Sequence, residues 1–281
     1  MTRSRSSSRS LSRFGKAGVL TLAGLFFVLP FAAMTRFALQ NVQVIDLGWS
    51  TLFDKWSLTV FGNAFDNDFF VDSLIMSSKL AIGTVALTLV LLVPTAVWVH
   101  LKLPRARAFV EFLTVLPYVI PAIGLVAGIV VVKPHIRWFI SSDLSLIPFY
   151  VVLALPFTYR AIDTGLQTID LKTLTEAARS LGSGWLRTLF TVIVPNLRSA
   201  IVASTFLTIA VVLGEFTIAD VLLKRTFPAF MAEYRQSDPR GGYALAVLAL
   251  ALTTVFFVIL AQLTRPKRRA DHVDAYSSRK T

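Results

Sequence analysis

Long apolar runs separated by short polar stretches dominate this chain. A helix needs about 20 mostly apolar residues to cross the hydrocarbon core of a bilayer. Six segments reach or approach that length: residues 17–35, 80–99 (extending back toward Ser73), 108–132, 144–159, 199–223 and 243–263. Their apolar positions are continuous instead of alternating at period two, which argues against spanning β-strands. The pattern therefore predicts an all-α integral membrane protein with six transmembrane helices.

The fourth segment is the weakest, because it is short and contains Pro148 and Pro156. The placement of basic residues gives an independent check, since cytoplasmic loops are enriched in Lys and Arg. With six spans and the N-terminus inside, 19 of the 28 Lys and Arg residues fall on the cytoplasmic side and 8 outside, with Lys79 inside a span. The bias supports six spans, both termini in the cytoplasm and a multi-pass protein of the bacterial inner membrane. It also places the polar loop 170–196 on the cytoplasmic side.

Composition narrows the functional classes. The net charge is +12, yet 55% of the residues are hydrophobic and the mean hydropathy is +0.67, which excludes an ordinary soluble domain. In a membrane protein, such a basic balance indicates cytoplasmic loops and contact with anionic lipid, and we expect no nucleic-acid partner. The chain has no cysteine and only three scattered histidines, so neither thiol chemistry nor a metal site is expected.

The chain divides into three regions. Residues 1–16 are rich in Ser and Arg and are predicted to be a disordered basic cytoplasmic N-terminus. Residues 17–263 form the six-span domain, and residues 264–281 form a basic cytoplasmic tail. The first apolar run imitates a secretory signal, but it is long for one, so an uncleaved anchor is expected.

The loop 170–196 has the features of a short helix, a turn and a second helix. Thr173 and Glu176 are spaced as a capping box, which predicts that Thr173 caps the first helix. Gly182 can adopt the left-handed conformation that ends a helix. Ser183-Gly184 then opens a second run, which Pro195 closes. Five apolar residues of that run are expected on roughly one face: Trp185, Leu186, Leu189, Phe190 and Ile193.

The spacing within this loop resembles a known motif. Glu176-Ala177-Ala178 is followed after three residues by Gly182, and Val192-x-Val194-Pro195 comes after nine more. This is similar to the EAA loop of permease subunits of binding-protein-dependent ABC importers, whose pattern is E-A-A, three residues, G, nine residues and I-x-L-P. The two valines are a mild departure from Ile and Leu. An ordinary amphipathic helix at the membrane surface is the competing interpretation.

The resemblance implies that the loop docks on an ATPase. Carried onto this chain, the docking residues are Glu176, Ala177, Ala178 and Gly182, with Arg179 and Leu181 adjacent and Pro195 closing the motif. It also implies two ATP-binding cassette subunits, a second permease subunit (a copy or a paralogue) and an extracytoplasmic solute-binding protein as partners. The sequence has no G-x-x-x-x-G-K-[ST] loop, so ATP hydrolysis is expected on a separate subunit. The chain itself is expected to be neither an enzyme nor a cofactor binder.

Candidate pathway residues lie within the predicted spans. Glu215 follows Gly214 inside the fifth span, and Lys79 lies near the outer end of the second. Buried ionisable groups in a membrane are functional candidates. We hypothesise that these two charges form an ion pair or line the outer pathway together; the alternative is that Lys79 extends outward and Glu215 faces a wet cavity alone. Pro117 and Pro121 resemble the prolines that break spans in the same family.

The substrate is less constrained. Gly214-Glu215-Phe216 and Thr226-Phe227-Pro228 are similar to permeases for polyamines, iron(III) and aminoethylphosphonate, while sugar and amino-acid permeases remain open. An outer loop carrying Asp46, Asp54, Asp66, Asp68 and Asp72 against Lys55 alone would suit a basic partner or a cationic solute, or is simply solvated. An ATP-independent channel or carrier is the alternative function.

Overall fold

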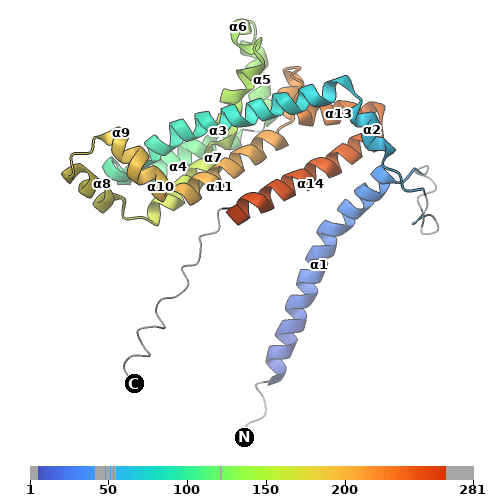
Figure 1. The fold of residues 1–281 in the computed structure, drawn as a ribbon, viewed down its shortest axis with the longest axis horizontal. Coiled ribbons are helices and arrows are strands. Elements are labelled where there is room, and N and C mark those ends of the chain that lie inside the picture. Colours follow the sequence, from blue (N-terminus) through green and yellow to red (C-terminus); the bar gives the residue numbers. More distant parts are fainter. Residues whose placement is uncertain are drawn as a thin grey trace. The chain divides into compact units, whose positions relative to one another are not determined.

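The computed structural model describes residues 6–41, 48, 51, 53, 55–120 and 122–263. Within them the chain is helical, and extended pairing is limited to one bridge between Gln40 and Trp56. The predicted all-α class is confirmed. Three short elements are the 3-10 turns η3 (Pro104–Ala106) and η4 (Asp143–Ser145) and the π-helical turn η5 (Leu189–Ile193). The α-helices (Figure 1) are α1 (Ser6–Leu39), α2 (Thr59–Phe65), α3 (Asp68–Lys102), α4 (Arg107–Val119), α5 (Ala122–Val132), α6 (Arg137–Ile140), α7 (Leu146–Gln167), α8 (Leu171–Ser180), α9 (Trp185–Thr188), α10 (Val194–Asn196), α11 (Arg198–Gly214), α12 (Thr217–Val221), α13 (Phe227–Ser237) and α14 (Pro239–Leu263).

Four helical segments in the described part are long and apolar enough to cross a membrane: Gly18–Leu39, Asp68–Lys102, Asp143–Gln167 and Pro239–Ile259. Two bent helix pairs, Pro104–Val119 with Ile123–Val132 and Trp185–Asn196 with Arg198–Gly214, raise the number to six if each pair counts as one span. The doubtful fourth segment is therefore helical, and it extends eight residues beyond the predicted end, to Gln167.

The third predicted span, 108–132, is not one continuous helix. It consists of α4 and α5, and the backbone at Ile120 is extended, with φ −85° and ψ 122°. Ile120 precedes Pro121, and the proline ring disfavours the helical region for the residue before it. Pro121 itself lies outside the described residues. Pro117 lies inside α4.

The fifth predicted span, 199–223, also breaks. Helix α11 ends at Gly214, and the short α12 begins at Thr217, after two intervening residues. Leu223 follows α12 with a positive φ of 57°, and the Lys224 N–H donates to the Ala219 carbonyl at 2.8 Å. These are features of a Schellman helix end, although Leu stands where Gly is usual. The C-terminal part of this segment is thus a helix, a break and a helical turn.

The N-terminal region differs from the predicted disorder of residues 1–16, because α1 begins at Ser6. Extending an existing helix avoids the unfavourable nucleation step, and Arg and Leu are good helix formers. The apolar helix that follows can therefore continue back through the Ser/Arg-rich segment. Residues 1–5 and the tail 264–281 lie outside the described part of the chain.

The chain divides into two compact units. Unit 1 comprises Met1–Lys79 and Leu213–Ala251, and unit 2 comprises Leu80–Val212 and Leu252–Thr281. The core of unit 1 is built from Ala64, Phe227, Phe230 and Leu245. The core of unit 2 joins α3 and α7 to the loop that follows α7, with members Leu92, Val93, Ala96, Val97, Tyr159, Ile162, Leu166, Leu171, Leu189, Ile193, Leu197 and Ala200. The loop residues of this core make the loop an integral part of unit 2.

Candidate coupling site

The first helix of the loop, α8, begins at Leu171 and is capped by Asp170. The Asp170 carboxylate accepts the backbone N–H of Thr173 at 3.2 Å. Hydrogen bonding from the Thr173 side chain and backbone holds the pKa of the Asp170 carboxyl below its ordinary value of 3.8. The prediction that Thr173 caps this helix was wrong. Asp and Thr are both good N-cap residues, and the structure uses Asp170, three positions earlier, so Thr173 lies in the first turn.

The far end of α8 is closed by Gly182, as the sequence predicted. Gly182 has φ +78°. Its N–H donates to the Arg179 carbonyl at 2.9 Å, and the Ser183 N–H donates to the Ala178 carbonyl at 3.0 Å. This pair of hydrogen bonds is a Schellman motif. A Cβ at Gly182 would meet no atom within 4 Å, so glycine is favoured here by backbone conformation and not by space.

The two faces of α8 differ. Leu171, Thr175 and Ala178 are buried, and α8 packs against η5 and α9. Glu176, Ala177, Arg179 and Leu181 are exposed. The Glu176 carboxylate lies 4.0 Å from the Lys172 amino group, an exposed pair one helical turn apart that contributes little to stability. Of the predicted docking residues, Ala178 is therefore buried, Ala177 and Leu181 are exposed, and Glu176 and Arg179 are exposed but also line the cavity described below.

The second half of the loop is less regular than predicted. It runs from α9 through η5 to α10, which contains the exposed Pro195. The apolar residues expected on one face are separated: Leu189 and Ile193 are buried, whereas Trp185, Leu186 and Phe190 are exposed. In a π turn the hydrogen bonds run from i to i+5, which changes the spacing of positions along one face. The projection thus exposes the apolar side chains of Leu181, Leu186 and Phe190.

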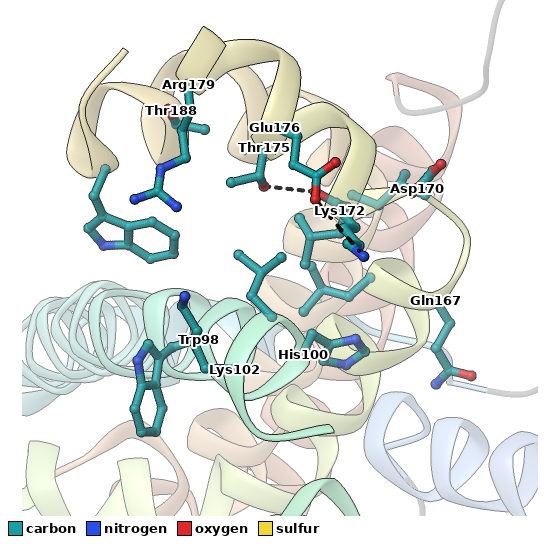
Figure 2. A pocket seen from close by; sticks show the side chains of 15 residues that line it. Trp98, His100, Lys102, Gln167, Asp170, Lys172, Thr175, Glu176, Arg179 and Thr188 are labelled. Atoms are coloured by element: carbon teal, nitrogen blue, oxygen red, sulfur yellow. Dashed lines mark hydrogen bonds and ion pairs between the residues drawn. The ribbon is translucent and has the colours of Figure 1, made fainter. Parts of the chain in front are cut away.

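A cavity of about 710 Å³ lies between the last turn of α3 and the helices of the loop, within unit 2 (Figure 2). Trp98, His100 and Lys102 line it from α3. Arg179 lines it from α8 and Trp185 from α9. The loop therefore covers a hollow space, lined by both polar and apolar side chains, next to the end of a candidate span.

A buried polar cluster lies at the edge of this cavity, and sequence reasoning missed it. Asp163 of α7 accepts two hydrogen bonds from Arg107 of α4, both at 2.6 Å. It also bonds His100 of α3 at 2.8 Å and Gln167 at 2.8 Å. Only 6% of the Asp163 side chain is exposed. The cluster fastens three helices together just before the chain enters α8.

The predicted pathway residues fall in both units. Glu215, Gly214 and Lys79 belong to unit 1, and Pro117 belongs to unit 2. Glu215 is buried at the break between α11 and α12, where its Oε1 accepts the Ile218 N–H at 2.8 Å and its Oε2 has no hydrogen-bond partner among the described residues. Lys79 is exposed, and the hypothesised ion pair between it and Glu215 is not formed. The position of a residue along the chain does not give the direction in which its side chain points.

Thr226-Phe227-Pro228, which had indicated a substrate group, begins α13. The Thr226 side chain accepts the Ala229 N–H at 3.4 Å, and the Phe227 N–H donates to the Ser77 hydroxyl at 2.7 Å. Pro228 occupies the first turn, where a missing N–H costs nothing. These residues have a local structural role, so their resemblance to a substrate group says less about the solute.

An all-α protein with several membrane-length helices and a fixed helical projection between two of them has the architecture of a transport permease. Residues 92–270 match the model of the binding-protein-dependent transport system inner membrane component family, and the chain belongs to this family. The predicted class is thereby confirmed.

Individual relatives agree with this assignment. The molybdenum transport system permease protein ModB of Escherichia coli strain K12 is 32% identical over 125 residues, 42% of this chain and 54% of ModB. The chain thus spans about half the length of that relative. The ORF1 protein of Streptomyces antibioticus, named as an ABC transporter permease, is 30% identical over 194 residues, 66% of this chain and 82% of that protein.

A solved structure shares the fold. It is the crystal structure of a bacterial ABC transporter involved in the import of the acidic polysaccharide alginate. The TM-score is 0.73, and the match covers 94% of this chain and 100% of the matched chain. At 15% identity this likeness shows the fold alone.

Proposed function

We propose that this chain is the transmembrane permease subunit of an ATP-driven importer in the bacterial inner membrane. Together with a second permease subunit, a copy or a paralogue, it encloses the solute pathway. Two ATPase subunits bind on the cytoplasmic side and a solute-binding protein outside. The observation that carries the proposal is the projection α8–α10, which is fixed on its inner face and exposes carboxylate and apolar groups on its outer face.

The projection is built to transmit displacement. Helix α8 is closed at one end by the Asp170 cap and at the other by the Gly182 motif. Leu171, Leu189 and Ile193 belong to the same core as residues of α3 and α7, so a force on α8 acts on both of those helices. Close-packed interiors transmit strain, because they have few voids to absorb it.

The outer face of the projection supports a protein partner. Leu181 is 88% exposed, and Leu186 and Phe190 are 66% and 65% exposed. Large exposed apolar side chains on a polar loop support an interaction site. Beside them, Ala177 presents only a methyl group, which lets another backbone approach α8 closely.

A charge reversal tests the docking role. We expect Glu176→Lys to lower solute uptake about tenfold or more, because it places an unmatched charge at the interface, where repulsion costs about 1.4–3 kcal/mol. The matched control is Glu233→Lys, which makes the same change on the exposed Glu233 of α13. Uptake, ATP hydrolysis and co-purification of the ATPase are measured on each variant.

The outcomes distinguish a coupling role, a docking role and ATP-independent transport. Lost uptake with the ATPase still bound supports coupling, and lost binding supports docking. Normal uptake in both Glu176→Lys and Leu181→Asp would contradict the assigned interface. Uptake that persists without ATP would favour the alternative, a channel or ATP-independent carrier.

The solute is proposed from resemblance. The stretch around Glu215 favours a polyamine, iron(III) or aminoethylphosphonate, whereas the similarity to ModB favours a molybdenum-containing anion. Because the solute-binding protein presents the ligand, isolating that partner with the permease and identifying its bound solute by mass spectrometry distinguishes these candidates.

A further inference from the structure

The cavity under the projection has the size and lining of a ligand site. Its volume of about 710 Å³ lies within the range of roughly 300–1,000 Å³ typical of small-ligand pockets. Two tryptophans, Trp98 and Trp185, contribute to the lining. The exposed apolar residues assigned to docking, Leu181, Leu186 and Phe190, do not line this space.

The charges in the cavity leave two cations without partners. Lys102, Lys172 and Arg179 line it together with Asp170 and Glu176. Glu176 lies 4.0 Å from Lys172, and Asp170 caps α8, so both carboxylates are engaged. Lys102 and Arg179 form no ion pair or hydrogen bond with the residues that the structure describes. Figure 2 shows both reaching into the side of the cavity where Trp98 lies, away from Asp170.

His100, which also lines the cavity, is hydrogen-bonded to Asp163. Its Nε2 lies 2.8 Å from the Asp163 carboxylate, which Arg107 also binds. The lysine, arginine and carboxylate side chains that line the cavity have a net formal charge of +1, and the two cations without a partner among the described residues are Lys102 and Arg179. A group that enters between them should carry negative charge.

The position of the cavity identifies the kind of anion. Trp98 and Lys102 lie in the last two turns of α3, at one end of a candidate span. Tryptophans mark the membrane–water interface, and lysines at span ends contact lipid headgroups. Basic pockets between membrane helices on the cytoplasmic side bind anionic headgroups.

We propose that this cavity binds the phosphate headgroup of an anionic phospholipid, with Lys102 and Arg179 as its direct contacts. A phosphate held by both residues would bridge α3 and α8, and so link the membrane span to the projection. The proposal rests on the proposed function only in placing this end of α3 at the cytoplasmic leaflet.

The proposed lipid site is tested by measuring lipid retention. The permease is purified in mild detergent together with the subunits that accompany it. Native mass spectrometry counts the bound phosphatidylglycerol and phosphatidylcholine added at equal concentration. We expect selective retention of phosphatidylglycerol, weakened roughly fivefold for each cation removed in Lys102→Gln and Arg179→Gln. The control pair is Arg105→Gln with Arg187→Gln, which removes the same charge from exposed residues that do not line the cavity.

Each outcome decides the proposal. Loss of lipid in the cavity double variant, with retention in the control, supports it. Equal retention of both lipids, or equal loss in both double variants, overturns it. Displacement by inorganic phosphate or by water-soluble glycerophosphoglycerol at matched ionic strength assigns the cavity to a soluble anion and overturns the lipid. Lipid binding is read without ATP or solute, so its failure leaves the importer assignment untouched, and an intact complex mass shows that each variant folds.

Discussion

Among the described residues two carboxylates are buried, Asp163 in unit 2 and Glu215 in unit 1, and their surroundings differ. Asp163 receives hydrogen bonds from Arg107 and Gln167 and lies 2.8 Å from His100. Glu215 receives one, from the Ile218 N–H, and its second oxygen has no partner among the described residues. The first is fully used in holding helices together. The second has unused capacity to accept a hydrogen bond or attract a cation.

This difference separates a structural charge from a functional candidate. A buried charge that is paired and hydrogen-bonded stabilises only as long as every partner is present. A buried carboxylate oxygen without a partner is costly, and a protein retains it mainly where water or a ligand can reach it. We therefore expect substitutions at Asp163 to act on folding and substitutions at Glu215 to act on transport.

The largest effect is expected at Asp163. Asp163→Leu leaves Arg107 and His100 without their shared acceptor, and breaking a buried pair in this way costs about 3–5 kcal/mol. Because 35% of the Arg107 side chain is exposed and can be rehydrated, we expect the lower end of this range. The free energy of unfolding in mixed micelles measures it. Asp72→Leu, on an exposed residue of α3, is the control. Equal, small losses in both variants would contradict the fastening role.

A smaller effect on stability is expected at Glu215, with a larger one on function. Glu215→Gln keeps an oxygen that can accept the Ile218 N–H, so the free energy of unfolding should change by less than about 1 kcal/mol. Glu215→Leu loses this acceptor at the start of α12 and should lower the free energy of unfolding by about 1 kcal/mol. If Glu215 faces the solute, both variants lower uptake by more than their stability explains. Normal uptake with Glu215→Gln would remove it from the pathway.

Hydropathy and local turn chemistry predicted the elements whose causes are local. The sequence predicted α1, α3 and α14 from their apolar runs, and it predicted the left-handed conformation of Gly182. Each of these features depends on residues close by in the chain. The break near Ile120 was indicated by Pro121, whereas the break after Gly214 was missed.

The Asp163 cluster could not be predicted in the same way. Its partners His100 and Arg107 lie 63 and 56 positions earlier in the chain, so their meeting depends on how α3, α4 and α7 pack. The predicted fourth span also ended at residue 159, which placed Asp163 in a loop. A helix extended to Gln167 would have shown Asp163 and Gln167 one turn apart, a weak signal of the cluster.

The smallest effect on stability is expected at Asp170. Unlike Asp163 and Glu215, this carboxylate is exposed. Its pKa is below the ordinary value of 3.8 because Thr173 donates to the charged form. The stabilisation of α8 by the charged Asp170 carboxylate is therefore complete above pH 3.8, and it is lost as the pH falls through the lowered pKa. We expect the protection of the Thr173 amide against hydrogen exchange, corrected for the intrinsic rate, to fall over that acidic range.

Asp170→Asn sharpens this result, because an amide oxygen can still accept the Thr173 N–H but does not titrate in the acidic range. Protection of α8 in this variant should be nearly independent of pH, with Asp66→Asn as the control on an exposed residue of unit 1. If acid weakens α8 equally in Asp170→Asn, the titrating group lies elsewhere in unit 2. The Asp163 cluster, which fastens α7 just before the loop, would then be the next group to test.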